Sequence, residues 1–210
     1  MTTPQPFTIV TGRAAPLPDA DVDTDIIFPA RFLLLTAREG LGQYAFHDRR
    51  FAGDGSEQPD FVLNREPWRS APVLVAGPNF GCGSSREQAV WALAGYGVRC
   101  IIAPSFGAIF HANCLRNGVL PIMLEPALMT QAMLAAQRGA RFAIGLEEQA
   151  ISIDQTHFAY FALSPERKLM LANGWDETDQ IIIQHGQEIA AFEARQEQVQ
   201  PWLYAACNED

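Results

Sequence analysis

Short apolar runs and helical periodicities alternate through the middle of the chain. The runs predict buried strands at 72–77, 100–103 and 119–123, and the periodic segments between them predict helices at 87–94 and 106–115. Ser105 is the expected N-cap of the second helix, and Asn117-Gly118 is its expected stop signal. This order of strand, helix, strand, helix and strand favours βαβ units with parallel pairing.

The two ends of the chain are patterned differently. Residues 1–70 are rich in loop signals, which include Pro16, Pro18 and the alternating aspartates that follow them. Beyond residue 125, helices are predicted at 126–138, 165–171 and 188–196, and short strands at 141–145, 150–153 and 157–162. The chain is therefore interpreted as one α/β domain, 1–210, with mixed sheet pairing and regions at 1–70, 71–125 and 126–210.

Composition narrows the class of protein. Hydrophobic residues make up 48% and charged residues 19% of 210 residues, which is enough for a packed core. The net charge of −9 makes nucleic acid a poor partner. No run approaches the roughly 20 apolar residues of a membrane span. The four cysteines form no Cys-x-x-Cys pair, which is typical of a reduced protein, so a cytoplasmic location is expected.

The segment most suited to chemistry is Gly77-Pro-Asn-Phe-Gly-Cys-Gly-Ser-Ser-Arg-Glu-Gln88, which joins a predicted strand to a predicted helix. Loops at the carboxyl ends of such strands are common binding sites. Its glycines allow close backbone approach to a ligand. Ser84 and Ser85 stand near the helix start, where N–H groups favour an anion, and Arg86 offers a planar fork for a carboxylate or phosphate.

Familiar motifs do not account for this segment. The final small residue of a dinucleotide fingerprint is replaced by Arg86, and neither the Gly-Lys-Ser/Thr of a Walker loop nor a Gly-x-Ser-x-Gly elbow is present. From the residues alone, a capped helix with a surface arginine explains the segment equally well.

A family resemblance favours the catalytic interpretation. Asn79-Phe-Gly-Cys-Gly-Ser-Ser-Arg-Glu87 resembles the signature of the aconitase swivel domain, in the form found in isopropylmalate isomerase small subunits. Further segments resemble that family in order and spacing, and together they cover nearly the whole chain: 21–29, 43–51, 59–64, 102–110, 171–174 and 184–193. The resemblance implies the swivelling β/β/α fold of the aconitase superfamily, like aconitase domain 4.

The resemblance also implies an activity and a partner. The family's reaction is a hydro-lyase reaction of leucine biosynthesis, in which 2-isopropylmalate is dehydrated and rehydrated to 3-isopropylmalate. The implied partner is a large subunit that carries a [4Fe–4S] cluster, in at least a heterodimer, and the implied ligand is a small dicarboxylate. Two alternatives stay open: a related small subunit acting on homocitrate, citramalate or dimethylmalate, and a non-catalytic carboxylate-binding module.

The resemblance assigns roles to individual residues. It implies that Ser84 is the catalytic base, assisted by Ser85 and Asp25, and that Arg86 and Arg38 bind substrate carboxylates. The 32–42 loop is expected to help choose the substrate side chain, with its three leucines either contacting that side chain or packing in the core.

Two features set limits on the resemblance. Gln88 occupies a position where the family pattern has histidine, and glutamine cannot hold a proton there. Cys82 lies inside the signature but lacks the spaced partner cysteines that an iron–sulfur cluster needs, and the four histidines show no metal-ligand spacing. No metal ligand is therefore expected on this chain.

Overall fold

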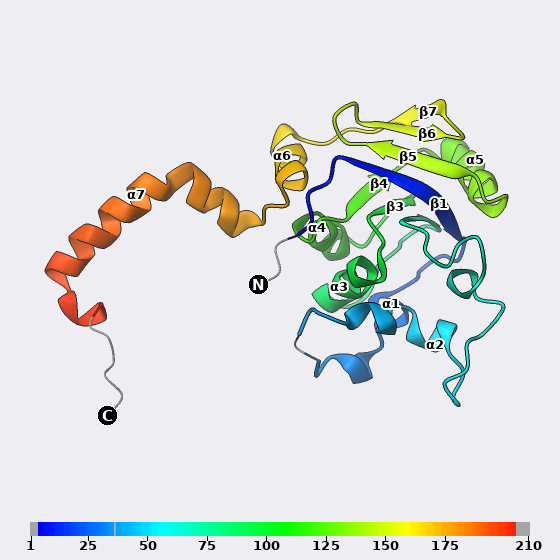
Figure 1. Ribbon diagram of the computed structural model, residues 1–210, viewed down its shortest axis with the longest axis horizontal. Coiled ribbons are helices and arrows are strands. Elements are labelled where there is room, and N and C mark those ends of the chain that lie inside the picture. Colours follow the sequence, from blue (N-terminus) through cyan, green and yellow to red (C-terminus); the bar gives the residue numbers. More distant parts are fainter. Residues whose placement is uncertain (1–3, 36, 205–210) are drawn as a thin grey trace.

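The computed structural model describes residues 4–35 and 37–204, and its centre is one seven-stranded mixed sheet (Figure 1). The strands are β1 (Ile9–Leu17), β2 (Val73–Ala76), β3 (Cys100–Ala103), β4 (Leu120–Met123), β5 (Arg141–Gly145), β6 (Ala150–Ile153) and β7 (Thr156–Tyr160). Their order is β4-β3-β2-β1-β5-β6-β7. β1 to β4 pair in parallel, whereas β5 to β7 continue from β1 in antiparallel pairing. The expected α/β class, parallel units and mixed sheet are confirmed.

Helices cover both faces of this sheet. The α-helices are α1 (Thr24–Ile27), α2 (His47–Arg50), α3 (Glu87–Tyr96), α4 (Ala108–Arg116), α5 (Pro126–Gln137), α6 (Pro165–Asn173) and α7 (Glu177–Val199). Short 3-10 helices are η1 (Ala30–Phe32), η2 (Leu41–Tyr44), η3 (Val62–Asn64) and η4 (Pro201–Leu203). Among the described residues, no helix combines the length and apolar character that a membrane crossing requires.

The buried strands supply side chains to a core on each side of the sheet. In β2, Val73 and Val75 join the core beneath α5, whereas Leu74 and Ala76 join the core beneath α3. Successive side chains of a strand point to opposite faces, so a strand covered on both sides is apolar throughout. This is why the central run of the sequence predicts strands without polar alternation.

β1 is the principal error of the sequence interpretation, which assigned its region to loops. The strand contains Gly12, Arg13 and Pro16, and it nevertheless lies in the middle of the sheet between β2 and β5. Pro16 sits opposite Val75 of β2. A proline donates no backbone hydrogen bond and is rare in central strands, so its presence argued against the assignment.

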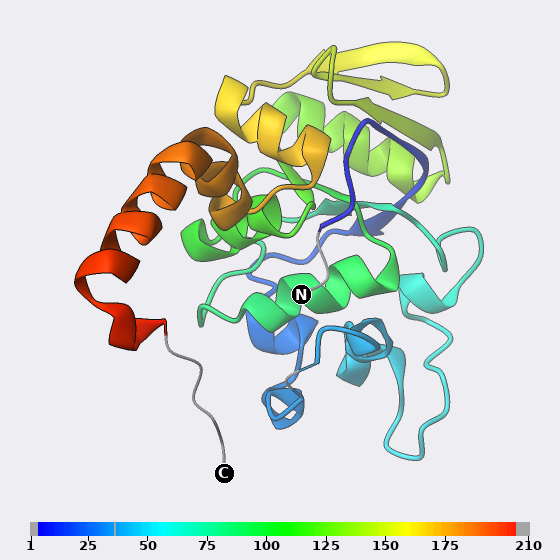
Figure 2. The same ribbon diagram turned by 60° about the vertical axis from the view of Figure 1, so that its left-hand side comes forward.

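Two helix boundaries also differ from expectation. The predicted helix at 188–196 lies within α7, which begins eleven residues earlier, at Glu177, after a capping box formed by Asp176 and Asp179. Helix α4 has Gly107 as its N-cap, without a side-chain cap, so the expected capping role of Ser105 is wrong. Figure 2 shows that α7 leaves the body of the molecule as an arm.

Between β1 and β2 the chain makes a long excursion, residues 18–72, over the outer side of α3. Its central piece, η2, packs against α3, where Gly42 meets Gly95 so closely that a Cβ on Gly42 would lie 2.3 Å from the Gly95 carbonyl carbon. Figure 1 shows this excursion beside α3, with α1 and α2 on it. The excursion is thereby fixed to the helix that follows the Gly77–Gln88 segment.

Candidate active site

Two loops leave the carboxyl ends of the neighbouring parallel strands β1 and β2 and remain hydrogen-bonded to each other. The Gly81 N–H donates to the Val22 carbonyl at 2.7 Å, and the Thr24 N–H donates to the Cys82 carbonyl at 3.0 Å. Asp23 and Cys82 form an isolated parallel bridge. We call residues 18–25 the aspartate-rich loop and residues 77–86 the glycine–serine loop; their paired residues are 58–61 positions apart in sequence. The two loops form one unit at the carboxyl ends of the parallel strands, where α/β proteins commonly bind ligands.

The backbone of the glycine–serine loop has conformations that few side chains permit. Gly81 has a φ of 72°, and a Cβ there would lie 2.1 Å from Cγ of Phe110 in α4. Gly83 has a φ of 88°, but a Cβ added there would lie no closer than 3.4 Å to its nearest neighbour, Cβ of Asp23. Asn79 has a φ of 58°, a conformation that asparagine tolerates better than most residues. The loop shape thus depends on these residue types.

The loop between β3 and α4 supports the same segment from the other side. The Asn79 N–H donates to Oγ of Ser105 at 2.8 Å, and the Phe80 N–H donates to the Ser105 carbonyl at 3.1 Å. The Gly107 N–H in turn donates to the Phe80 carbonyl at 3.0 Å. Ser105 therefore anchors the glycine–serine loop, a role that its position before a predicted helix did not indicate.

Ser84 and Ser85 lie on the exposed part of this loop, just before α3. The Ser84 carbonyl accepts hydrogen bonds from Thr24 Oγ1 at 2.9 Å and from the Arg86 N–H at 2.8 Å, which fixes its backbone. Arg86 is the N-cap of α3, and its side chain makes no capping hydrogen bond. The N–H groups of the first helical turn and the helix dipole give this end of α3 a positive potential.

Arg86 and Asp25 come together across the two loops. Nη1 of Arg86 donates to Oδ1 of Asp25, and the same oxygen accepts the Ala30 N–H at 2.8 Å. The Arg86 hydrogen bond, followed by the Ala30 bond, holds the pKa of Asp25 below its usual range. The carboxylate therefore stays ionised at neutral pH and orients the guanidinium of Arg86, whose side chain is 20% exposed.

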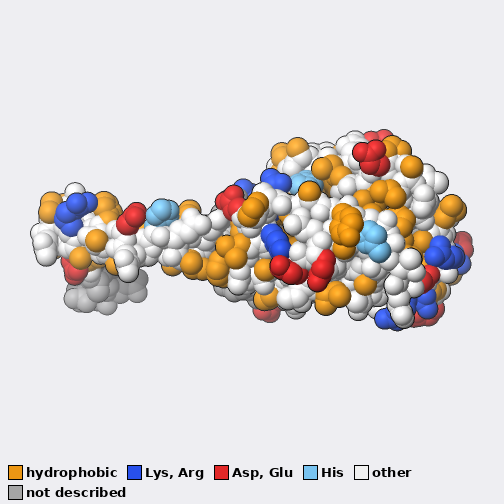
Figure 3. All heavy atoms as spheres, turned by 90° about the horizontal axis from the view of Figure 1, so that it is seen from above, with side chains coloured by type: hydrophobic (Ala, Val, Ile, Leu, Met, Phe, Trp, Pro, Cys, Tyr) orange, Lys and Arg blue, Asp and Glu red, His pale blue; other side chains and the backbone are white. Residues whose placement is uncertain are grey.

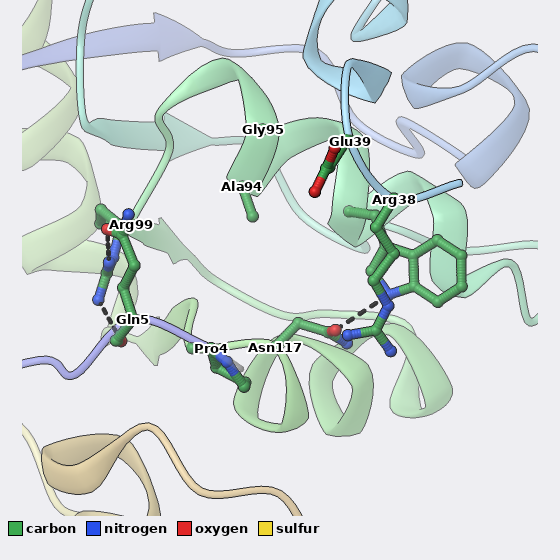
Figure 4. Close-up of a pocket in the computed structure, with 10 residues that line it drawn as sticks. Pro4, Gln5, Arg38, Glu39, Ala94, Gly95, Arg99 and Asn117 are labelled. Carbon is green, nitrogen blue, oxygen red and sulfur yellow. Dashed lines mark hydrogen bonds between the residues drawn. The ribbon is translucent and has the colours of Figure 1, made fainter. Parts of the chain in front are cut away.

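Arg38 is placed differently from the other residues of the expected set. Its guanidinium lies 4.4 Å from the ring centroid of Trp91 and 3.9 Å from Oε1 of Glu87, so it contacts the side of α3 rather than the Asp25–Arg86 pair. Together with Arg99 on the opposite wall, it lines a cavity of about 220 Å³ (Figure 4). The sequence did not indicate this stacking.

The 32–42 loop contains residue 36, which lies outside the described residues. Leu34 is 92% exposed, and Leu35 is 38% exposed. These two leucines line a shallow depression together with Tyr44. Both side chains are therefore available for contact with another molecule, whereas Leu33 is half-buried and packs against the core beneath α3.

A second ion pair near Asp25 escaped the sequence interpretation. Arg31 donates from Nη1 to Oδ2 of Asp48 at 2.8 Å and from Nη2 to Oδ1 of the same carboxylate. These bonds and a weaker one from His47 lower the pKa of Asp48 to about 2. The segment 43–51 was one of those that carried the family resemblance, and this was the available signal for Asp48.

The cysteines are free thiols wherever the structure describes them. Cys100 and Cys114 are fully buried, and burial raises the pKa of both. Cys82 is half-buried, and burial followed by the charges of Asp21 and Asp23 raises its pKa as well. Within residues 4–35 and 37–204, no group of three or more cysteine, histidine or acidic side chains could hold a metal ion. Cys207 lies outside the described residues.

Comparisons with family models and with known proteins give the same family along most of the chain. A model of the aconitase C-terminal domain matches residues 4–127, and a model of the C-terminal domain of the 3-isopropylmalate dehydratase small subunit matches residues 183–206. The 3-isopropylmalate dehydratase small subunit of Rhodospirillum centenum is 48% identical over 93% of this chain and 97% of its own length. The protein of that name from Gluconacetobacter diazotrophicus is 48% identical over 93% and 95% of the two chains.

A solved structure shows the same fold. The crystal structure of 3-isopropylmalate dehydratase (leuD) from Methanocaldococcus jannaschii aligns with a TM-score of 0.63 at 29% sequence identity. The alignment covers 88% of this chain and 99% of that one. The resemblance, which rested on motifs, is thereby confirmed over most of the chain.

Proposed function

The chain belongs to the 3-isopropylmalate dehydratase small-subunit family of the aconitase superfamily, and from this premise we propose that its paired loops supply the proton-transfer half of the active site. The family's reaction is the dehydration of 2-isopropylmalate and the rehydration that yields 3-isopropylmalate. The observation that carries the proposal is the exposed Ser84, fixed by its backbone at the positive end of α3 beside the Asp25–Arg86 pair.

Ser84 is proposed to act as the general base. As an alkoxide, Oγ removes the proton from the carbon next to a carboxylate during dehydration, and as a hydroxyl it returns a proton on rehydration. A serine alkoxide needs local stabilisation because a free serine is a very weak acid. The first N–H groups of α3, the neighbouring Ser85 hydroxyl and the Arg86 guanidinium provide dipoles and charge for this purpose.

Arg86 is proposed to bind a substrate carboxylate. A guanidinium has five N–H donors, and the bond to Asp25 occupies one nitrogen, so further donors remain for a second carboxylate. Asp25 acts in this proposal by holding the fork in one orientation. Arg38 is proposed as a second carboxylate ligand. From its present position against Trp91, the loop that carries it would have to bring the side chain toward Arg86 when substrate binds.

The missing half of the site is proposed to come from the large subunit. The described thiols and carboxylates do not fit an iron–sulfur cluster, since no suitable group of ligands exists among them. We therefore assign the [4Fe–4S] cluster to the large subunit, where it would supply a Lewis acid for the departing hydroxyl. The partners would form at least a heterodimer. The free thiols and the small-molecule substrate also support a cytoplasmic location.

The comparisons favour this function over the two alternatives. Relatives at 48% identity over nearly their full length carry the 3-isopropylmalate dehydratase name. No observation on the described residues favours homocitrate, citramalate or dimethylmalate. Gln88 is half-buried in the first turn of α3, and we propose that it orients the loop without carrying a proton.

The experiment that tests this proposal uses the chain reconstituted anaerobically with a cluster-loaded large subunit. Ser84→Ala should lower turnover of 2-isopropylmalate by about 10²–10⁴-fold or more while the two proteins still co-elute. Ser70→Ala, which removes an exposed hydroxyl away from the site, is the matched control and should behave as the wild type. Near-normal turnover in the Ser84→Ala complex would remove Ser84 from the mechanism.

A further inference from the structure

Helix α7 stands apart from the body of the protein. A hydrogen bond from Nε2 of Gln180 to Oε1 of Glu166, 3.1 Å long, ties its base to α6, and from there the helix runs away from the sheet (Figures 1 and 2). At its far end η4 folds back on it, held by a 2.8 Å hydrogen bond from the Tyr204 hydroxyl to Gln196. We call residues 177–204 the arm. An isolated helix in water gains little stability, because most helical stability in proteins comes from packing an apolar face.

The arm has such an apolar face without a partner among the described residues. Ile182, Ile189, Phe192 and Val199 follow one another at intervals of seven, three and seven residues, which places them along one side of the helix, with His185 and Gln196 between them. Exposed fractions are 55% for Ile182, 52% for Phe192 and 68% for Val199. In Figure 3 hydrophobic side chains appear on the arm near its tip and near its junction with the body, with polar side chains and backbone between them. The opposite side carries Gln184, Gln187 and Gln198 together with alanines and a single exposed isoleucine, Ile183.

The tip of the arm adds side chains typical of binding hot spots. Trp202 is 68% exposed and Tyr204 is 42% exposed. Tryptophan and tyrosine are enriched among the interface residues that contribute most of the binding energy. An exposed apolar patch that contains them usually marks a protein-binding site. The spacing of the stripe matches the seam through which one helix packs against another.

Charge selects the kind of partner. Glu193 and Glu197 border the apolar stripe on one side, Glu188 and Arg195 border it on the other, and the whole chain has a net charge of −9. In a parallel pairing with a second copy, Glu188 of one arm would face Glu193 of the other, which is unfavourable. A partner surface with an apolar groove bordered by lysine or arginine satisfies both the stripe and its flanks.

We propose that the arm docks into an apolar, basic-edged groove of the large subunit. The inference rests on the proposed function, because the partner is the protein that completes the active site. The family model of the C-terminal domain of these small subunits spans residues 183–206, so this segment is a feature of chains that carry the small-subunit name. The arm binds at a distance from the loops that carry Ser84, and it therefore contributes affinity without taking part in the chemistry.

The experiment uses the full chain and the purified large subunit. Ile189→Glu and Phe192→Glu should each raise the Kd of the complex by about 10- to 100-fold, because a charge replaces an apolar anchor. Gln187→Glu adds the same charge on the opposite side and is the matched control, with an unchanged Kd expected. At saturating large subunit, all variants should reach the wild-type kcat, and raising the salt concentration should weaken the wild-type complex.

Two further measurements separate the possible outcomes. Hydrogen exchange of residues 177–204 should slow when the large subunit binds, and light scattering should show the isolated chain as a monomer. Stripe variants with the wild-type Kd, or an isolated chain that dimerises through the arm, would overturn the proposal. Failure of the proposed function gives a different result, since a wild-type complex would then assemble through the arm without turning over 2-isopropylmalate.

Discussion

Replacing Gly81 with alanine tests how far the loop shape depends on one glycine. The new Cβ would meet Phe110 at 2.1 Å, and Phe110 is 2% exposed and packs edge-on to Phe80 with ring centroids 5.6 Å apart. A left-handed conformation costs a non-glycine residue about 1–2 kcal/mol. Overpacking a core costs about 1–3 kcal/mol more. We therefore expect Gly81→Ala to lower the free energy of unfolding by about 2–5 kcal/mol.

Gly83 is the matched control in the same loop. Its φ of 88° is equally unsuited to alanine, but a Cβ there has its nearest neighbour at 3.4 Å. Gly83→Ala should therefore cost the conformational part alone, about 1–2 kcal/mol. Urea unfolding of the isolated chain measures both variants, provided that the slope of the transition is unchanged.

A double-mutant cycle isolates the clash itself. In a Phe110→Ala background the obstructing ring is absent, so the additional cost of Gly81→Ala should fall to the conformational part of about 1–2 kcal/mol. If Gly81→Ala cost the same in both backgrounds, or no more than Gly83→Ala, the reasoning from the Phe110 contact would be refuted.

Three other predictions concern the ion pairs and the helix start. Arg86→Lys should lower kcat/KM by at least about tenfold with assembly intact, since lysine lacks the rigid fork, and unchanged steady-state kinetics would contradict the role of Arg86. Gln88→His should leave turnover and the ranking of hydroxy-acid substrates unchanged in a panel assay, whereas an altered ranking would favour a divergent small subunit. Asp48→Asn should destabilise the chain by less than about 1 kcal/mol at pH 6, because the pair with Arg31 is largely exposed. The folded pKa of Asp48 is depressed to about 2 from 3.8, so this difference should be present above pH 4 and disappear as acid unfolding is followed down to pH 2.

The sequence predicts the parallel half of the fold well because β2 and β3 are buried on both faces. Continuous apolar runs are sufficient evidence for such strands. The same criterion fails for β1, whose Gly12, Arg13 and Pro16 resemble a loop. Its conformation is set by hydrogen bonds to β2 and β5, and those partners lie about 60 and 130 residues away in the chain.

The candidate site, like the fold, is predicted where it depends on local sequence and missed where it depends on contacts between distant segments. Local sequence identifies the glycine–serine loop as suited to an anion, and the family resemblance nominates Ser84 and Arg86. Neither indicates that Asp25 binds Arg86, because that contact follows from the adjacency of β1 and β2. The roles of these residues stay predictions until variants are measured. The sequence predicts only part of α7 for another reason. Gly186 interrupts an otherwise periodic helix, and the apolar side of that helix faces no core.

The excursion between β1 and β2 has a consequence for how such chains can diversify. Its first part, residues 18–30, is hydrogen-bonded to the glycine–serine loop, and its middle is fixed to α3 where Gly42 meets Gly95. Substitutions at exposed positions between these two contacts therefore change the surface near the site without removing a bond that holds the loops around Ser84. The leucines at 34 and 35 lie on this excursion and are exposed. New substrate preferences could therefore arise by substitution of these exposed leucines, while Ser84, Arg86 and Asp25 keep their positions.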